Sequence, residues 1–227
     1  MPLDVLRVKA LCFDIDGTLC DTDDQLVLQL ARWLSVTRFI LPRHDALRSA
    51  RRLVMFTEGP GNWLYSLADR LGLDAQLEAL GDRFVDLGIA KSAQPYRLVS
   101  GILVMLDNLA SHYPMAIIST RGHKATYRFM EQSNLTPYFR AIITGQSCSH
   151  TKPYPDPVIR AAGLLGVTPG SCLMVGDTVV DILSGKRAGA QTVGVLCGFG
   201  ERSELYHAGA DLLVESTPDL LNHLVLS

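Results

Sequence analysis

The chain has 227 residues, enough for one large domain or two unequal ones, and its 21 basic and 23 acidic residues give a formal net charge of −2. This balance gives no reason to expect a nucleic acid or an anionic membrane as a partner. The five cysteines are widely spaced without a C-x-x-C pair, which argues against a disulfide scaffold or zinc site and favours a reducing compartment. Neither a signal peptide nor a membrane-length apolar stretch is visible, so we expect a cytoplasmic protein, with no prediction of its oligomeric state.

The first predicted element is a buried strand at residues 6–13, where the run is rich in β-branched, aliphatic and aromatic side chains. The run stops at Asp14 and Asp16, and Gly17 then lets the backbone turn sharply. Because side chains alternate along an extended segment, Asp14 and Asp16 share a face, and their repulsion is costly unless a cation or a proton lies between them. The alternative is a local turn and helix-cap cluster, since Asp, Gly and Thr are favoured in both.

Helices and loops are predicted for the stretch that follows, with amphipathic segments on both sides of a loop at residues 57–62. The stretch is too large for an ordinary loop, so we expect a separate helical subdomain. On one of its helices Arg48, Arg51 and Arg52 share a side, either as a solvated face or as a site for a second anionic group. The predicted division is an α/β core at residues 1–20 and 94–227 with a helical cap at residues 21–93.

From residue 94 onward, short apolar strands alternate with helices. The predicted strands are at residues 115–119, 141–144, 171–176, 192–196 and 212–214. The predicted helices are one with an apolar stripe of Ile102, Leu103, Leu106 and Leu109, and others at residues 123–134, 155–165, 179–188, 203–208 and 218–224. This alternation indicates an α/β fold, a doubly wound, Rossmann-like parallel sheet with helices on both faces.

Polar side chains follow most of these strands directly. In a parallel α/β sheet, functional residues gather beyond the carboxyl ends of the strands. Each residue has an ordinary explanation by itself, as a cap or a solvated lysine, but their common position at one sheet edge predicts a site. These side chains are Asp14 and Asp16 after the first strand, Ser119, Thr120 and Arg121 at the second, Lys152 after the third, and Asp177 and Asp181 after the fourth.

Four motifs at these strand ends also occur together in a known family. They are Asp14-Ile-Asp-Gly-Thr, a strand that ends in Ser119, Lys152-Pro153, and Gly176-Asp177 followed by Asp181. With these motifs the chain resembles the haloacid dehalogenase superfamily, and within it the phosphoglycolate-phosphatase-like branch with a helical cap. The resemblance covers the whole core, and the helical insert matches the family's cap in position and size. It therefore implies a catalytic core with an inserted cap.

The resemblance implies that Asp14 is the nucleophile, which attacks phosphorus and forms an aspartyl phosphate. It implies that Asp16 is the acid and base, which protonates the leaving oxygen and then deprotonates the attacking water. A Mg²⁺ cofactor would be held by Asp14, the main-chain carbonyl of Asp16, and Asp177. Asp181 would contact the metal through a water molecule or orient Lys152.

The resemblance also implies which residues bind the phosphate group of a small phosphorylated substrate. Ser119 would donate its hydroxyl, and the ammonium of Lys152 would stabilise negative charge in the transition state. Many relatives have Asn after the Ser119 position, where this chain has Thr120, so an amide contact is lost, and Thr120 and Arg121 are the candidates to replace it as phosphate ligands. For Arg121 the alternative is a solvated arginine in a loop.

Departures from the family's pattern select among its reactions. Asp16 argues against carbon–halogen cleavage, Lys91 as the only cap lysine argues against phosphonate cleavage, and Gly176 replaces the Glu that many mutases have. We therefore expect a Mg²⁺-dependent phosphatase for a small phosphorylated metabolite, phosphoglycolate-like or a sugar phosphate. The alternatives are an inorganic pyrophosphatase, a β-phosphoglucomutase-like mutase, and a phospho-accepting signalling module, against which the second acid, Asp16, argues.

Overall fold

The predicted parallel sheet is present, with six strands in the order β3-β2-β1-β4-β5-β6 and every neighbouring pair parallel. The computed structural model describes residues 3–21 and 96–224. The predicted cap lies outside these residues apart from Asp21, as do Lys91 and the three cap arginines, so the division into core and cap stays a prediction. The strands are β1 (Ala10–Phe13), β2 (Met115–Ile118), β3 (Ala141–Ile143), β4 (Cys172–Gly176), β5 (Gln191–Val195) and β6 (Leu212–Val214).

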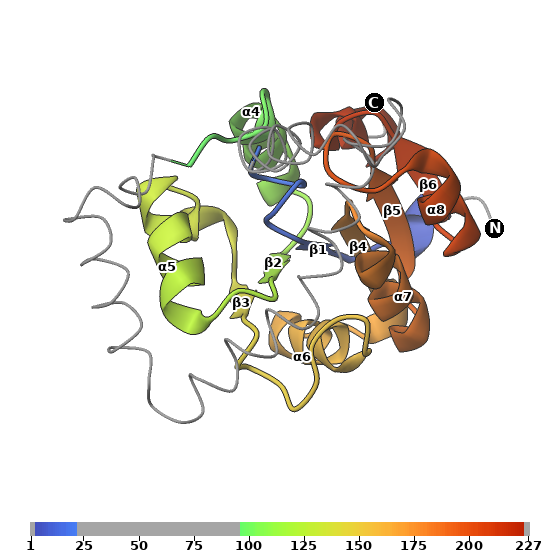
Figure 1. The fold of residues 1–227 in the computed structure, drawn as a ribbon, viewed down its shortest axis with the longest axis horizontal. Coiled ribbons are helices and arrows are strands. Elements are labelled where there is room, and N and C mark those ends of the chain that lie inside the picture. The colour runs from blue at the N-terminus through green and yellow to red at the C-terminus, as the bar shows by residue number, and fades with distance from the viewer. Residues whose placement is uncertain (1–2, 22–95, 225–227) are drawn as a thin grey trace, which may run out of the picture.

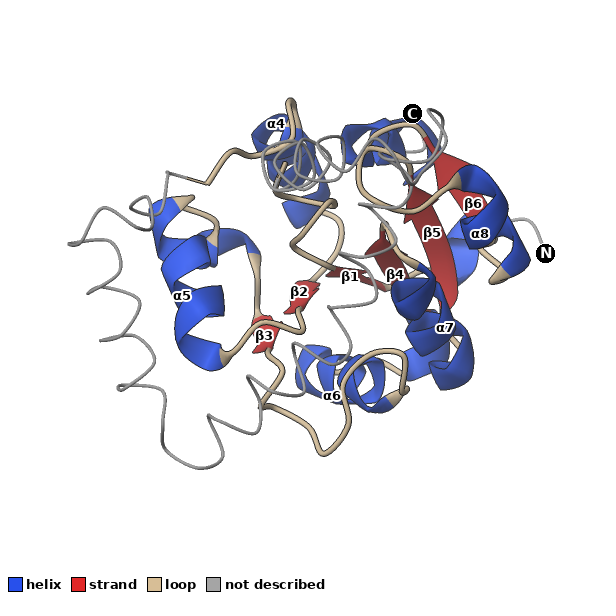
Figure 2. Ribbon diagram, in the orientation of Figure 1, coloured by secondary structure: helices blue, strands red, loops and turns tan. Residues whose placement is uncertain are grey.

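Helices cover both faces of the sheet, which confirms the doubly wound arrangement (Figure 1). The helices α6 and α7 pack on one face, while α4, α5 and α9 contribute to the core on the other. Figure 2 shows the strands, in red, between α4 and α6. The helices are α4 (Ile102–Ala110), α5 (His123–Gln132), α6 (Asp156–Leu165), α7 (Val179–Ala188), α8 (Arg202–His207) and α9 (Leu221–Leu224), with 3-10 turns at Val5–Arg7, Thr136–Tyr138, Pro169–Ser171 and Thr217–Leu220.

The core is divided between the two faces by the alternation of side chains along each strand. On β1, Leu11 and Phe13 belong to the larger cluster, which also contains residues of α4 and α5. Ala10 and Cys12 face the other way, where small side chains let α6 approach the sheet closely. Side chains on both faces of β1 are fully buried, which explains why the sequence of this strand is a continuous apolar run. Burial of a side chain such as Phe13 stabilises the fold by roughly 1.5–3 kcal/mol.

Two predicted elements differ from the structure for identifiable reasons. The first strand begins at Ala10 and not at residue 6, because its pairing with β4 begins at Ala10 with Cys172; the preceding Val5–Arg7 form a 3-10 turn in which Leu6 is exposed. The apolar stripe of α4 contains Met105 where Leu103 was expected, and Leu103 is exposed. The i, i+3, i+4, i+7 spacing from Ile102 explains this, because it selects residue 105. The other boundaries predicted within residues 96–224 agree within two residues, although the C-terminal helix begins as a 3-10 turn.

All five cysteines lie in the described part of the chain and are free thiols. Cys12 and Cys172 are buried in the smaller cluster, where they pack as small core residues. None of the helices within residues 3–21 and 96–224 combines the length and the hydrophobicity that a membrane span requires.

Candidate active site

The strand register explains why distant polar residues meet at one edge of the sheet. Phe13 on β1 pairs with Ile117 on β2 and with Val175 on β4. The next residue, Asp14, donates its main-chain N–H to the Val175 carbonyl at 3.0 Å. Ser119 and Asp177 each follow their pairing residue by two positions, so both emerge beside Asp14. In this strand order, β2 and β3 extend the sheet on one side of β1, and β4, β5 and β6 extend it on the other side. Doubly wound folds bind ligands in the crevice at the point where the strand order reverses in this way.

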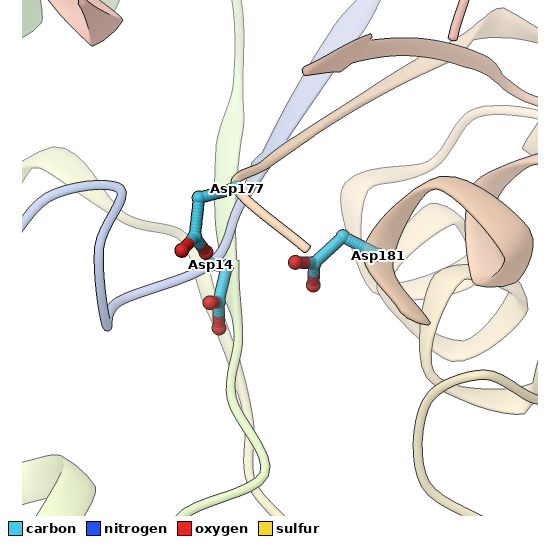
Figure 3. A group of neighbouring side chains, drawn as sticks. All are labelled: Asp14, Asp177 and Asp181. Atoms are coloured by element: carbon cyan, nitrogen blue, oxygen red, sulfur yellow. The ribbon is translucent and has the colours of Figure 1, made fainter. Parts of the chain in front are cut away.

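Asp14, Asp177 and Asp181 form a cluster of buried carboxylates at this edge. One oxygen from each lies within 4.8 Å of the others. Figure 3 shows the Asp14 and Asp177 carboxylates next to each other, with that of Asp181 turned toward them from the first turn of α7. The structure thus brings together the ends of two non-consecutive strands, as the sequence predicts.

The chain around Asp177 is shaped to hold its carboxylate in place. The Phe199 N–H donates to Asp177 Oδ2 at 2.8 Å, and the Thr18 hydroxyl lies 3.5 Å from Oδ1. Two glycines lie against the same carboxylate, and a Cβ at Gly17 or Gly198 would collide with it. Gly17 also has φ +68°, a left-handed conformation that glycine adopts without strain. The glycine after the two acids therefore serves the turn and the packing of Asp177.

Lys152 links two members of the cluster. Its Nζ donates to Asp14 Oδ1 at 2.7 Å and to Asp181 Oδ1 at 2.6 Å, and its side chain is 3% exposed. Lys152 is therefore not a solvated lysine, which was its ordinary explanation. Burial alone would lower the pKa of Lys152, but the two carboxylates outweigh this and raise it, so the ammonium stays charged.

Asp181 has a second structural task at the start of α7. Its Oδ2 accepts hydrogen bonds from the Thr178 main-chain N–H at 3.0 Å and the Thr178 hydroxyl at 2.6 Å, within a capping box. The N-cap of α7 is thus Thr178, so the ordinary explanation as a helix cap does not apply to Asp177. Asp181 Oδ1 contacts Lys152 while Oδ2 is bound by Thr178, so the first turn of α7 fixes the carboxylate that holds Lys152.

Asp14 lies in a strongly perturbed electrostatic environment. Burial, together with the charges of Asp181 and Asp16, raises the pKa of Asp14 to about 8, although Lys152 acts in the opposite direction. Three carboxylates meet here with the single ammonium of Lys152 bridging two of them. Additional positive charge at this place would favour the ionised form of Asp14.

These donors fit Mg²⁺, which prefers carboxylate and carbonyl oxygens. Asp14 and Asp177 come from the ends of adjacent strands, and the carboxylate of Asp177 is fixed by the glycines that pack against it. The carboxylate of Asp16 pairs with Arg121 and is not a member of the cluster. The predicted contact between Asp16 and the metal is through the main-chain carbonyl, and it stays a prediction.

Arg121 forms a bidentate ion pair with Asp16. Its Nε donates to Asp16 Oδ2 at 2.7 Å, and a terminal nitrogen contacts Oδ1. The side chain of Arg121 is 17% exposed, so its alternative explanation as a solvated loop arginine is wrong. Burial alone would lower the pKa of Arg121, but Asp16 outweighs this and raises it.

Ser119 is buried at the end of β2, and its Oγ accepts the main-chain N–H of Arg121 at 3.2 Å. Thr120 is half-buried, and its main-chain carbonyl lies against Gly145, where a Cβ would collide with it. Phosphate binding by these two residues stays a prediction. Sequence reasoning missed residues 196–200, although this loop also follows a strand, β5, and contains Gly198 and Phe199.

Comparisons with known proteins agree with this arrangement. The family model described as haloacid dehalogenase-like hydrolase matches residues 11–195. The chain is 28% identical to the phosphoglycolate phosphatase of Neisseria meningitidis serogroup A, over 96% of this chain and 94% of that protein. It is 26% identical to the pyrophosphatase PpaX of Anoxybacillus flavithermus, over 96% and 98%. A crystal structure of a hydrolase from Pseudomonas syringae superposes with a TM-score of 0.65 at 27% identity, over 95% of this chain and 97% of that one. The chain belongs to the haloacid dehalogenase-like hydrolases.

Proposed function

We propose that this protein is a Mg²⁺-dependent phosphatase that hydrolyses a small phosphorylated metabolite through an aspartyl phosphate on Asp14. One observation carries the proposal. Asp14 lies in hydrogen-bond contact with the buried ammonium of Lys152 and beside Asp177, while a second acid, Asp16, follows two residues later. This arrangement supplies a nucleophile, a positive charge, a metal-binding partner and a proton donor at one sheet edge.

In the first step, an oxygen of Asp14 attacks the phosphorus atom while the bond from phosphorus to the leaving oxygen breaks. Asp16 enters this step protonated on one carboxyl oxygen, while its other oxygen accepts the hydrogen bond from Arg121 Nε, and it gives that proton to the leaving oxygen, so the alcohol leaves without a negative charge. The ammonium of Lys152 and the hydroxyl of Ser119 face the phosphoryl oxygens, where negative charge grows.

In the second step, a water molecule attacks the phosphorus atom of the aspartyl phosphate. Asp16, now ionised, accepts the proton of this water, and the bond between Asp14 and phosphorus breaks. Inorganic phosphate leaves, and both acids return to their starting states. Asp181 contributes by holding Lys152, which it contacts at 2.6 Å.

The residues that would hold Mg²⁺ are Asp14, Asp177 and the main-chain carbonyl of Asp16. When bound, the ion supplies positive charge that offsets the repulsion between the Asp14 carboxylate and the phosphate. The cluster of buried carboxylates supports this part of the proposal, because a bound cation would hold Asp14 ionised, as its attack requires.

The similarity to phosphoglycolate phosphatase and to pyrophosphatase PpaX supports a small phosphorylated substrate, and it keeps pyrophosphate as a second candidate. The mutase alternative receives less support. Mutase relatives often have Glu before the metal-binding Asp, and a side chain at Gly176 would collide with Asp181.

Release of phosphate from p-nitrophenyl phosphate with Mg²⁺ and with EDTA tests the proposal. We expect multiple turnovers that require the metal, and none from Asp14→Asn, which keeps the shape of the side chain. A panel of 2-phosphoglycolate, glucose 1-phosphate and pyrophosphate then separates the monoester and pyrophosphate candidates. A single turnover that leaves a stable phosphoprotein would favour the signalling alternative and contradict the proposal.

A further inference from the structure

We infer that Arg121 is a positioning residue, which holds the carboxylate of Asp16 in the orientation that proton transfer requires. This inference rests on the proposed function, because Asp16 acts there as acid and base. It departs from the expectation that Arg121 binds the phosphate group itself.

The contact between the two side chains fixes both oxygens of Asp16. Arg121 Nε donates to Oδ2 at 2.7 Å, and a terminal nitrogen of the same guanidinium contacts Oδ1. Two parallel hydrogen bonds define the plane of the carboxylate as well as its position, which a single contact does not. The pair joins neighbouring strand ends, since Asp16 follows β1 and Arg121 follows β2.

The guanidinium is itself held between two aromatic rings. Its Cζ lies 5.2 Å from the ring centre of Tyr96 and 5.4 Å from that of Phe129. The rings contact each other edge to face, with centres 5.0 Å apart. Such contacts stabilise a planar cation and restrict its rotation. Phe129 lies on the buried face of α5, so one of the two rings that hold the guanidinium belongs to the hydrophobic core.

The main chain of Arg121 is fixed as well. Its N–H donates to Ser119 Oγ at 3.2 Å, and its carbonyl accepts the N–H of Gly145 at 2.9 Å. A phosphate that approached the Nε edge of the guanidinium would have to displace the carboxylate of Asp16. The geometry therefore favours a fixed support for Asp16 over a group that reaches for the substrate.

Tyr96 lies beside the chain that carries Asp16. The N–H of Asp21 donates to the Arg97 carbonyl at 2.7 Å, and the N–H of Val99 donates to the Leu19 carbonyl at 3.0 Å. These bonds tie residues 96–99 to the end of the turn that begins with Asp16. Truncation of Tyr96 to Ala should therefore produce a weaker form of the Arg121 effect, whereas Tyr96→Phe keeps the ring and should resemble the wild type.

The leaving-group dependence of kcat/KM separates positioning from phosphate binding. A displaced general acid matters little for p-nitrophenyl phosphate, whose leaving group departs easily, and much for an alkyl phosphate. For Arg121→Gln we expect kcat/KM to fall by less than about tenfold with p-nitrophenyl phosphate and by about 100-fold or more with glycerol phosphate, within the range that general acids contribute. Inhibition by inorganic phosphate should change by less than about threefold. Arg121→Lys, with one point charge and no planar fork, should recover only part of the loss.

An equal loss for both substrates, accompanied by weaker inhibition by phosphate, would overturn the inference and identify Arg121 as a phosphate ligand. A variant as active as the wild type on both substrates would also overturn it. Arg160→Gln, an exposed arginine on α6, is the matched control and should change neither substrate. Thermal melting of each variant confirms that the protein measured is folded. Absence of Mg²⁺-dependent activity in the wild type would instead contradict the proposed function, so the two failures are distinguishable.

Discussion

Lys152 Nζ lies 2.7 Å from Asp14 Oδ1, although 138 residues separate the two in sequence. Both side chains are buried, so the ion pair is shielded from water. Removal of one partner from such a pair leaves an uncompensated buried charge and usually destabilises a protein by about 3–5 kcal/mol. The raised pKa of Asp14 reduces this destabilisation, because the carboxyl group accepts a proton when Lys152 is removed.

We expect Lys152→Met to lower kcat by about 10²–10³-fold, the usual effect of losing a group that stabilises transition-state charge. Steady-state kinetics with p-nitrophenyl phosphate and Mg²⁺ measures this. Lys186→Met is the control, because Lys186 pairs with Asp211 away from the carboxylate cluster and its loss should leave kcat unchanged. Activity of Lys152→Met within a fewfold of the wild type would contradict the role given to Lys152.

Gly198→Ala should weaken Mg²⁺ binding, because a Cβ at this position collides with the carboxylate of Asp177. Disturbance of a ligand's surroundings commonly costs about 10–100-fold in metal affinity, and the Mg²⁺ concentration for half-maximal activity should rise by that factor. Gly163→Ala on α6 is the matched control, since nothing lies within 4 Å of its added methyl group. The control should keep its Mg²⁺ dependence and gain up to about 1 kcal/mol of stability from helix propensity. The same Mg²⁺ dependence in both variants would show that Asp177 does not hold the metal.

The stability of the core should depend on pH through Asp211. Burial alone would raise the pKa of Asp211, but hydrogen bonds from Lys186 and Thr192 outweigh this and hold it below its usual range. A lowered pKa in the folded state contributes stability that is present above the ordinary Asp pKa and is lost as the pH falls through the folded-state value. We expect Asp211→Asn to cost about 1 kcal/mol at neutral pH and progressively less in acid. Urea unfolding of both proteins over a pH series measures the difference, and a cost that is constant with pH would refute this explanation.

The backbone features of this fold follow from patterns that the sequence carries locally. Alternating strands and helices predict the sheet, and the carboxyl-end rule places Asp14 and Asp177 at one edge because Phe13 and Val175 are paired. The side-chain partners do not follow in the same way. Nothing in the local sequence indicates that Arg121 turns toward Asp16 and not toward a substrate, because that choice depends on Tyr96 and Phe129, which other segments supply.

The packing of other residues against the clustered carboxylates could not be predicted from the sequence pattern either. Gly198 looks like any loop glycine until the structure places it against Asp177. The capping box formed by Thr178 and Asp181 has a recognisable spacing, but its link to Lys152 requires the tertiary fold. The surface position of Leu103 shows the opposite case, in which a closer count of the helical spacing would have corrected the prediction.

The most direct test of the central claim is to locate the phosphoryl group during turnover. Wild-type and Asp16→Asn protein are mixed with an aryl phosphate and Mg²⁺, quenched in acid within milliseconds, and digested for mass spectrometry. We expect phosphate on the peptide that contains Asp14, at higher occupancy in Asp16→Asn because the second step lacks its base, and none in Asp14→Asn. Phosphate on a different residue, or continued turnover by Asp14→Asn, would contradict the claim.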